Sequence, residues 1–220
     1  MSDRKILIIA MLVVVALVVG GGIGLQAWRT GRDPKAVTAP AYSEPPVSII
    51  DGQPIRLGAS SAPVKVSLYE DFHCPHCADF ETEFGPTLVA AQQRGEVQLE
   101  LYPMSFIDAG SRNAANALGC AAEAGFGAGY YHGLFANHTL QWSDPQLLDL
   151  AAKVGGTASP EFSRCVTTRA HQGWVDSVNA AAEHNGVQGT PTMFVDAASV
   201  DIAGLTPETL DAMITNAAKK

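Results

Sequence analysis

The sequence predicts an α/β domain that follows an apolar N-terminal segment. In APVKVSLYEDF (Ala62–Phe72), apolar residues alternate with polar ones, which is typical of a strand with one buried face. Apolar residues recur at helical spacing from Ala78 onward, and a second strand pattern follows in EVQLELYPM (Glu96–Met104). A strand, a helix and another strand in this order predict an α/β architecture.

A long helical block follows the second predicted strand and spans about residues 107–186. Its segments with helical spacing are Ser111–Gly125, Asp144–Gly155 and Ser159–Gly186. The pattern then changes, because Thr192–Val195 and Ser199–Ala203 predict two short strands around a turn. A final helix is expected from Thr206, a capping residue that is followed by a proline.

The N-terminal segment contains an uncharged apolar run, Ile6–Leu25, which follows two basic residues. A helix needs roughly 20 such residues to cross a bilayer. We therefore expect a transmembrane anchor at residues 6–27, a cytoplasmic tail at residues 1–5 and the remainder of the chain outside the cell membrane. A cleaved signal peptide is the alternative, but its small-residue site, Ala39–Ala41, lies far from the run.

The anchor is followed by a stretch rich in proline and alanine, residues 28–46, which predicts an extended tether. Residues 47–220 then have the size of an ordinary single domain. The chain has 14 basic and 22 acidic residues, giving a net charge of −8, and no basic cluster lies beyond the membrane flanks. This charge pattern disfavours nucleic-acid binding.

Between the first strand and its helix lies Cys-Pro-His-Cys, with cysteines at Cys74 and Cys77. Pro75 suits the first turn of a helix, so Cys74 is expected at the N-terminus of that helix. The helix dipole there, together with a hydrogen bond or a positive charge from His76, is expected to lower the pKa of Cys74. Cys77, one turn further on, is then positioned to attack a mixed disulfide on Cys74.

Two other roles for the cysteine pair are less consistent with the sequence. A zinc site needs about four ligands, and neither a second Cys-x-x-Cys nor a spaced histidine pair is present. His73 lies beside the pair, whereas His132, His138, His171 and His184 lack ligand spacing. A purely structural disulfide across two residues would remove little chain entropy. The pair therefore favours redox catalysis without a metal.

The order of motifs resembles that of a known superfamily. A strand, a Cys-Pro-His-Cys helix and, more than a hundred residues later, Gly-Thr-Pro-Thr (Gly189–Thr192) before a strand resemble the thioredoxin superfamily. The helical block is similar to that of the DsbA-like branch. With the apolar run and FGPT (Phe84–Thr87), the chain resembles membrane-anchored thiol-disulfide oxidoreductases of actinobacteria. This resemblance implies a thioredoxin fold with an inserted helical domain.

The resemblance also implies roles for individual residues. Cys74 matches the exposed attacking cysteine and Cys77 the resolving one. The Pro75–His76 dipeptide is typical of strong oxidants in this family. Thr190 and Pro191 match the cis-proline pair that faces the active site, where the Thr190 backbone is expected to bind substrate in a strand-like manner.

The remaining cysteines, Cys120 and Cys165, both fall in the helical block. Related actinobacterial proteins have a structural disulfide in this position, so the resemblance implies a Cys120–Cys165 bridge; two free buried thiols are the alternative. No organic cofactor is expected, because Gly-Gly-Gly-Ile-Gly (Gly20–Gly24) lies inside the apolar run and is no dinucleotide fingerprint.

The function implied is the introduction of disulfides into unfolded or reduced exported proteins, followed by reoxidation by a quinone-linked membrane partner, commonly of the vitamin K epoxide reductase type. The alternatives are an isomerase or reductase on the same fold and a tethered binding module without catalysis. One position departs from the family. DsbA proteins of the periplasm carry a buried acid six residues before the first cysteine, where this chain has Leu68. Glu70 and Asp71 lie nearer, and strand alternation places at least one of them towards solvent.

Overall fold

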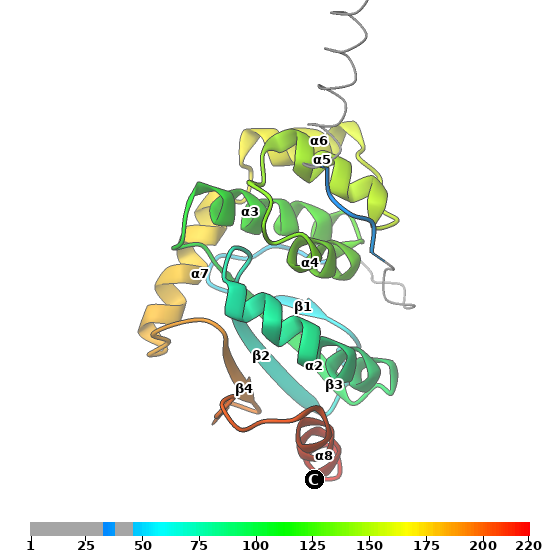
Figure 1. Ribbon diagram of the computed structural model, residues 1–220, viewed down its shortest axis with the longest axis vertical. Helices are drawn as coiled ribbons and strands as arrows, with labels where there is room; N and C mark the ends of the chain where they lie inside the picture. The colour runs from blue at the N-terminus through cyan, green and yellow to red at the C-terminus, as the bar shows by residue number, and fades with distance from the viewer. Residues whose placement is uncertain (1–32, 38–45) are drawn as a thin grey trace, which may run out of the picture. The chain divides into compact units, whose positions relative to one another are not determined.

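The computed structural model describes residues 33–37 and 46–220 and forms a mixed α/β fold around one five-stranded sheet (Figure 1). The strand order is β1-β3-β2-β4-β5, in which β2 and β3 are parallel and the other neighbours are antiparallel. The strands are β1 (Ile55–Leu57), β2 (Val64–Asp71), β3 (Val97–Met104), β4 (Thr192–Val195) and β5 (Ala198–Val200). The α/β architecture expected from the sequence is confirmed.

Helix α2 (Pro75–Gln93) connects the two parallel strands and crosses the sheet in Figure 1. One face of β2 and β3 is apolar along the middle of the strands, since Val66 pairs with Leu99 and Leu68 with Leu101, and all four side chains are buried. The apolar residues predicted to face the core from α2 are also buried; they are Phe80, Phe84, Leu88 and Ala91. This β2-α2-β3 unit fixes the start of α2 at the carboxyl end of β2.

Five helices lie between β3 and β4 in the chain, and α3 to α6 gather at the upper end of the domain in Figure 1. They are α3 (Ala109–Glu123), α4 (Gly127–Ala136), α5 (Asp144–Lys153), α6 (Pro160–Thr168) and α7 (Gln172–His184). The expected helix Ser159–Gly186 is broken into α6 and α7, because Arg169 adopts a left-handed φ of 57°. A last helix, α8 (Pro207–Ala217), begins after Thr206 as predicted.

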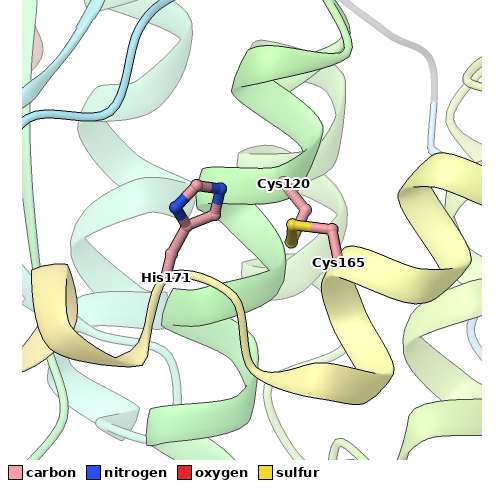
Figure 2. Close-up of side chains that lie close together, drawn as sticks. All are labelled: Cys120, Cys165 and His171. Carbon is pink, nitrogen blue, oxygen red and sulfur yellow. A yellow bond between two sulfur atoms is a disulfide. The ribbon is translucent and has the colours of Figure 1, made fainter.

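A disulfide joins two helices of this block (Figure 2). Cys120 on α3 and Cys165 on α6 are bonded and stand 45 positions apart in the sequence. Cys120 is buried and its neighbours on α3 belong to the main core. The bridge therefore fixes α6 to the central helix of the block.

The folded unit begins before residue 47. Pro34 is buried, and its carbonyl accepts a hydrogen bond of 2.6 Å from the Lys153 ammonium group. The backbone N–H of Lys35 donates to the Asn137 side chain at 2.6 Å, and the Asn137 amide donates back to the Lys35 carbonyl at 3.1 Å. Part of the expected tether, residues 34–37, thus lies on the domain because its backbone groups find partners at the C-terminal end of α4 and on α5.

The expected anchor at residues 6–27 and the tail at residues 1–5 lie outside the described residues. Within residues 33–37 and 46–220, no helix combines the length and the apolar character that a bilayer span requires.

Candidate active site

The two cysteines of the Cys-Pro-His-Cys motif begin α2, as the sequence predicts. Cys74 is the N-cap residue with extended backbone angles (φ −76°, ψ 116°), and Pro75 occupies the first turn. Both cysteines are free thiols; Cys74 is 7% exposed, whereas Cys77 is completely buried. His76 and Pro75 lie exposed on the same turn. The outer sulfur is therefore the one within reach of a partner molecule.

A segment from the far end of the chain lies against this turn. The Thr190–Pro191 peptide bond is cis, and the Cys74 thiol donates to the Thr190 carbonyl with an Sγ–O distance of 3.6 Å. β4, which begins at the next residue, pairs antiparallel with β2, and this pairing positions the segment. The structure thus places Cys74, Cys77, Thr190 and Pro191 together.

Glu70 and Asp71 are both buried, which corrects the expectation that one of them faces solvent. Glu70 is 2% exposed and Asp71 is 0% exposed. Alternation holds along the first half of β2, but its last four residues are buried whichever face they occupy. The reason is that α2 and α4 cover one face of the strand end, where Glu70 meets Tyr131, while α3 covers the other, where Asp71 meets Ser111.

Glu70 shares a polar cluster with two other buried side chains. The Tyr131 hydroxyl on α4 contacts Glu70 Oε2 and also lies 2.8 Å from Oε1 of Glu81 on α2. The second oxygen of Glu70, Oε1, is buried and has no hydrogen-bond partner among the described residues. Burial first, and then the neighbouring Glu81 charge, raise the pKa of Glu70 well above its usual value of 4.5.

The same cluster acts on the inner cysteine. Burial raises the pKa of Cys77 most, and the negative charge of Glu70 raises that pKa further. Cys77 is therefore held as a neutral thiol beside a carboxyl group that is itself reluctant to ionise. Because burial disfavours a Cys77 thiolate and keeps Glu70 protonated, a thiolate released at Cys77 can take its proton from Glu70.

Asp71 holds the backbone around the site. Its side chain accepts hydrogen bonds from the His73 N–H at 2.9 Å and from the Ser111 hydroxyl at 2.6 Å. It also accepts from the N–H groups of Phe106 and Ile107, at 3.2 and 3.3 Å. Four donors satisfy this fully buried carboxylate. Phe106 and Ile107 themselves are 58% and 43% exposed, so the loop presents two apolar side chains beside the cysteine turn.

His73, which precedes the motif, has a structural position. Its Nδ1 lies 2.7 Å from the Asp108 carboxylate, and its Nε2 lies 2.8 Å from the Leu140 carbonyl oxygen. The ring is so closely enclosed that a Cβ atom on Gly110 would stand 2.3 Å from its Cε1. His73 therefore connects the cysteine turn to the helical block and does not line a groove.

One further cluster has the composition of a metal site. Cys120, Cys165 and His171 lie close together (Figure 2), and their ligand atoms are all within 4.8 Å of one another. The two sulfurs are bonded to each other, so neither offers a thiolate. The His171 Nε2 is engaged with Glu123 at 2.9 Å. These residues therefore form a structural disulfide with a histidine packed beside it, and they do not provide a set of free metal ligands.

Sequence reasoning missed Tyr131 and Glu81 and left Glu70 undecided. An acidic pair directly before the cysteine motif was a visible signal, because a charged residue at the end of a buried strand needs a partner. Tyr131 gave no such signal. It lies 61 residues from Glu70 in the sequence, and only the packing of α4 against α2 brings them together.

The Glu70 environment gives a prediction on stability. We expect Glu70→Gln to raise the melting temperature of the oxidised protein at pH 7 by about 2–4 °C for each kcal/mol gained. In the unfolded chain Glu70 ionises from about its usual value of 4.5, whereas the folded chain keeps it protonated to a higher pH. The wild type therefore loses stability as the pH rises above that value, and the variant does not.

Thermal unfolding at several pH values between 4 and 8 tests this expectation. The difference between variant and wild type should be small at the acid end and grow towards neutral pH. Glu83→Gln is the matched control, since Glu83 is exposed on the same helix. A pH-independent difference for Glu70→Gln, or the same difference for both variants, would contradict the burial argument.

Comparisons with known proteins agree with this geometry. A family model described as thioredoxin matches residues 51–216. Among curated proteins, none is a significant match to the sequence. The fold is similar to that of reduced DsbA from Mycobacterium tuberculosis, with a TM-score of 0.66 and 23% identity over 77% of this chain and 94% of that one.

Two other solved structures share the fold. BdbD from Bacillus subtilis in its oxidised form has a TM-score of 0.66 and 22% identity, covering 86% of this chain and 100% of that one. MdbA, a thiol-disulfide oxidoreductase from Actinomyces oris, has a TM-score of 0.65 and 24% identity, covering 73% and 84%. The family match spans most of the described chain, including the cysteine motif, the helical block and the cis-proline segment. The chain therefore belongs to the thioredoxin family.

Proposed function

We propose that this protein is an extracytoplasmic thiol-disulfide oxidoreductase that introduces disulfide bonds into exported proteins. The observation that carries the proposal is the position of Cys74. Cys74 is the N-cap residue of α2, where unpaired N–H groups and the helix dipole favour negative charge, and its sulfur lies 3.6 Å from the carbonyl oxygen of Thr190. Cys77 is buried one turn away as the resolving thiol. The likeness to DsbA, BdbD and MdbA structures supports this reading.

The reaction is an exchange of sulfur bonds. A substrate thiolate attacks Cys74 of the Cys74–Cys77 disulfide, the bond between the two cysteines breaks, and Cys77 leaves as a thiolate that takes a proton from Glu70. A second thiolate of the substrate then attacks the substrate sulfur of the mixed disulfide and releases Cys74 as a thiolate. Two electrons move from the substrate to the protein, and the substrate gains a disulfide.

The site has separate features for binding and for leaving-group stability. The partly exposed Thr190 and Pro191 offer backbone groups to an extended substrate, and the exposed His76 adds a donor on the same turn as Cys74. A thiolate stabilised at a helix N-terminus is a good leaving group, so it transfers the disulfide readily. These features favour net oxidation over isomerisation.

The location and the partners belong to the same proposal. Residues 6–27 form a single membrane span, and the domain lies outside the cytoplasm, where an oxidising environment allows a Cys120–Cys165 disulfide to persist. Each catalytic cycle leaves Cys74 and Cys77 reduced, so a membrane partner must remove two electrons. A quinone-linked oxidase of the vitamin K epoxide reductase type fits this requirement.

The reduction potential of the Cys74–Cys77 pair tests the proposal. We expect the full-length chain, equilibrated against glutathione buffers, to have a potential nearer the value of about −120 mV for DsbA than the value of about −270 mV for thioredoxin. The physical reason is that stabilisation of the Cys74 thiolate favours the reduced form. Alkylation of free thiols followed by mass measurement gives the reduced fraction.

Cys120 and Cys165 provide an internal reference in this titration. Both should remain bonded across buffers that reduce the active-site pair, because the bridge joins two packed helices of the core. A potential close to that of thioredoxin would refute net oxidation and favour a reductase on the same fold.

A further inference from the structure

A chain of titratable side chains leads from the buried cysteine to the protein surface. Glu70 lies close enough to Cys77 for its charge to act on that thiol. The Tyr131 hydroxyl contacts Glu70 Oε2 and lies 2.8 Å from Glu81 Oε1. The other oxygen of Glu81, Oε2, lies 3.4 Å from Nδ1 of His132. Three side chains, those of Glu70, Tyr131 and Glu81, therefore connect Cys77 to a histidine whose side chain is 22% exposed.

The hydrogen bonds of Tyr131 require a proton on one of the two glutamates. A tyrosine hydroxyl carries one hydrogen and can donate to only one carboxylate. Its contact with the second carboxyl is favourable when that carboxyl is protonated and donates to the hydroxyl oxygen. Glu70 and Glu81 therefore share a proton through Tyr131. When the Tyr131 hydroxyl gives its hydrogen to one glutamate and receives the shared proton from the other, a proton passes between the two glutamates.

Around Glu70, the described residues offer few other carriers for a proton. The small cavity that Glu70 and Tyr131 line with Leu68, Phe72 and Leu101 has no room for a water molecule. No lysine or arginine of residues 33–37 and 46–220 forms a salt bridge with Glu70 or Glu81. The titratable groups that face Glu70 are Tyr131 from α4, and Glu81, Cys74 and Cys77 from α2 and its cap, whereas the Tyr102 ring of β3 stacks on Tyr69 on the other face of the sheet.

The outer end of the chain opens into a surface pocket. Glu81 and His132 line a cavity of about 320 Å³ beside Thr82, Gly85 and Pro86. Gly85 leaves this approach open, because a Cβ atom there would stand 3.1 Å from Glu81 Oε2. The pocket is large enough for water and for a small buffer molecule. Protons from solvent thus have access to His132 and to the adjacent carboxyl group.

We propose that Tyr131, Glu81 and His132 form a proton relay that exchanges the Glu70 proton with solvent during each disulfide exchange. The inference rests on the proposed oxidoreductase function. When the Cys74–Cys77 bond breaks, the Cys77 thiolate takes the proton of Glu70. Glu81 then takes a proton from His132 and solvent and passes it to Tyr131, which gives its own hydroxyl proton to Glu70. Reoxidation of Cys77 runs the same transfers in reverse.

The three residues act through Glu70 and do not touch the reacting sulfurs, so the test needs more than a loss of rate. Stopped-flow oxidation of a dithiol peptide by the full-length chain is measured at constant neutral pH and ionic strength, with increasing imidazole. We expect His132→Ala to lower the rate about tenfold or more, by analogy with proton-transfer groups in general. Imidazole should restore that rate with saturation, because it fits the pocket that the missing ring enlarges.

Tyr131→Phe should also lower the rate about tenfold or more, without rescue by imidazole, because the break then lies inward of the pocket. Tyr130→Phe is the matched control. It removes a buried hydroxyl from the adjacent residue, where the group donates to the Leu147 carbonyl at 2.7 Å, and it should leave the rate unchanged. The phenyl ring retains the contacts of Tyr131 with Phe72 and Phe135.

The possible outcomes separate the relay from the function on which it rests. If the wild type is active and His132→Ala reacts at the wild-type rate, the relay is overturned. The relay is also overturned if His132→Ala is slow and imidazole does not restore its rate. Equal effects of Tyr131→Phe and Tyr130→Phe overturn it as well. If Tyr131→Phe does not fold, the His132 and imidazole measurements still decide, since His132 is partly exposed. A wild type that does not oxidise the peptide overturns the oxidoreductase proposal itself.

Discussion

Replacing Cys74 by serine should abolish the oxidation of a reduced, unfolded protein. Cys74 is the half of the pair that substrate can reach, because Cys77 is completely buried, and serine at position 74 can form no mixed disulfide. We expect no oxidation above the uncatalysed rate when reduced ribonuclease is followed by recovery of its activity. A tethered binding module, in contrast, would keep its function in this variant.

Cys77→Ser provides the matched comparison, since it removes one sulfur from the same turn but leaves the attacking one. This variant should also fail to oxidise ribonuclease, yet it should form a long-lived mixed disulfide with a substrate that contains a disulfide. A reductant-sensitive band on a non-reducing gel reports that species. Activity that survives in Cys74→Ser, or a stable mixed disulfide in that variant, would refute the assignment of Cys74 as the attacking group.

Removing the Cys120–Cys165 bridge should give the largest loss of stability. For a sequence separation of 45, the chain-entropy relation gives about 4 kcal/mol at 25 °C. A change of that size lowers the melting temperature of a domain of this length by about 8–16 °C. Thermal unfolding of Cys120→Ala with Cys165→Ala, followed by far-UV circular dichroism, measures the loss.

A chain that already carries Cys74→Ser and Cys77→Ser is the control for this experiment. In that background a reductant acts only on the Cys120–Cys165 bond, so the oxidised and reduced forms have the same sequence. Their melting temperatures should differ by a similar amount. A difference of only a degree or two would show that the packing of α6 against α3 and α5 holds the block together without the bridge.

The catalytic half of the fold was predictable because its signals are local. Alternation over Ala62–Phe72 gave β2, and apolar spacing after Ala78 gave α2 and its buried face. The cysteines stand at the boundary between two such patterns, so the position of Cys74 at the helix start follows from the sequence alone. Propensity, hydrophobic period and the proline at the first turn all indicate the same structure there.

Helix α4 and the strand β1 were not predicted, for different reasons. Gly127–Ala136 contains three glycines and several aromatic residues, which are weak helix formers, and its apolar residues show no single face. Tertiary packing forms this helix: a Cβ atom on Gly133 would stand 2.7 Å from Val154, so close contact with the α5 region requires glycine. Strand β1 has only three residues, too few for a period to be recognised.

The polar cluster at the site depends on these unpredicted parts. Tyr131 is on α4, and because that helix was not predicted, Tyr131 could not be identified as the partner of Glu70. Strand alternation gave the wrong burial for Glu70 and Asp71, because it assumes that one face of the sheet is exposed to solvent. At the carboxyl end of β2, helices cover both faces. Local sequence patterns predict whether a residue is on a strand, whereas its exposure to solvent depends on the layers that pack against that strand.

The hydrogen bonds that Asp71 accepts from the loop amides should lower the entropic cost of binding a polypeptide at this surface. Apolar side chains on a free loop lose backbone freedom when they bind, at a cost of about 1–2 kcal/mol for each residue that becomes fixed. Here the amides of Phe106 and Ile107 are already tethered to a buried carboxylate, so that ordering occurs when the domain folds. The two exposed side chains form a preorganised contact area beside the cysteine turn, and contact with them costs little further backbone entropy.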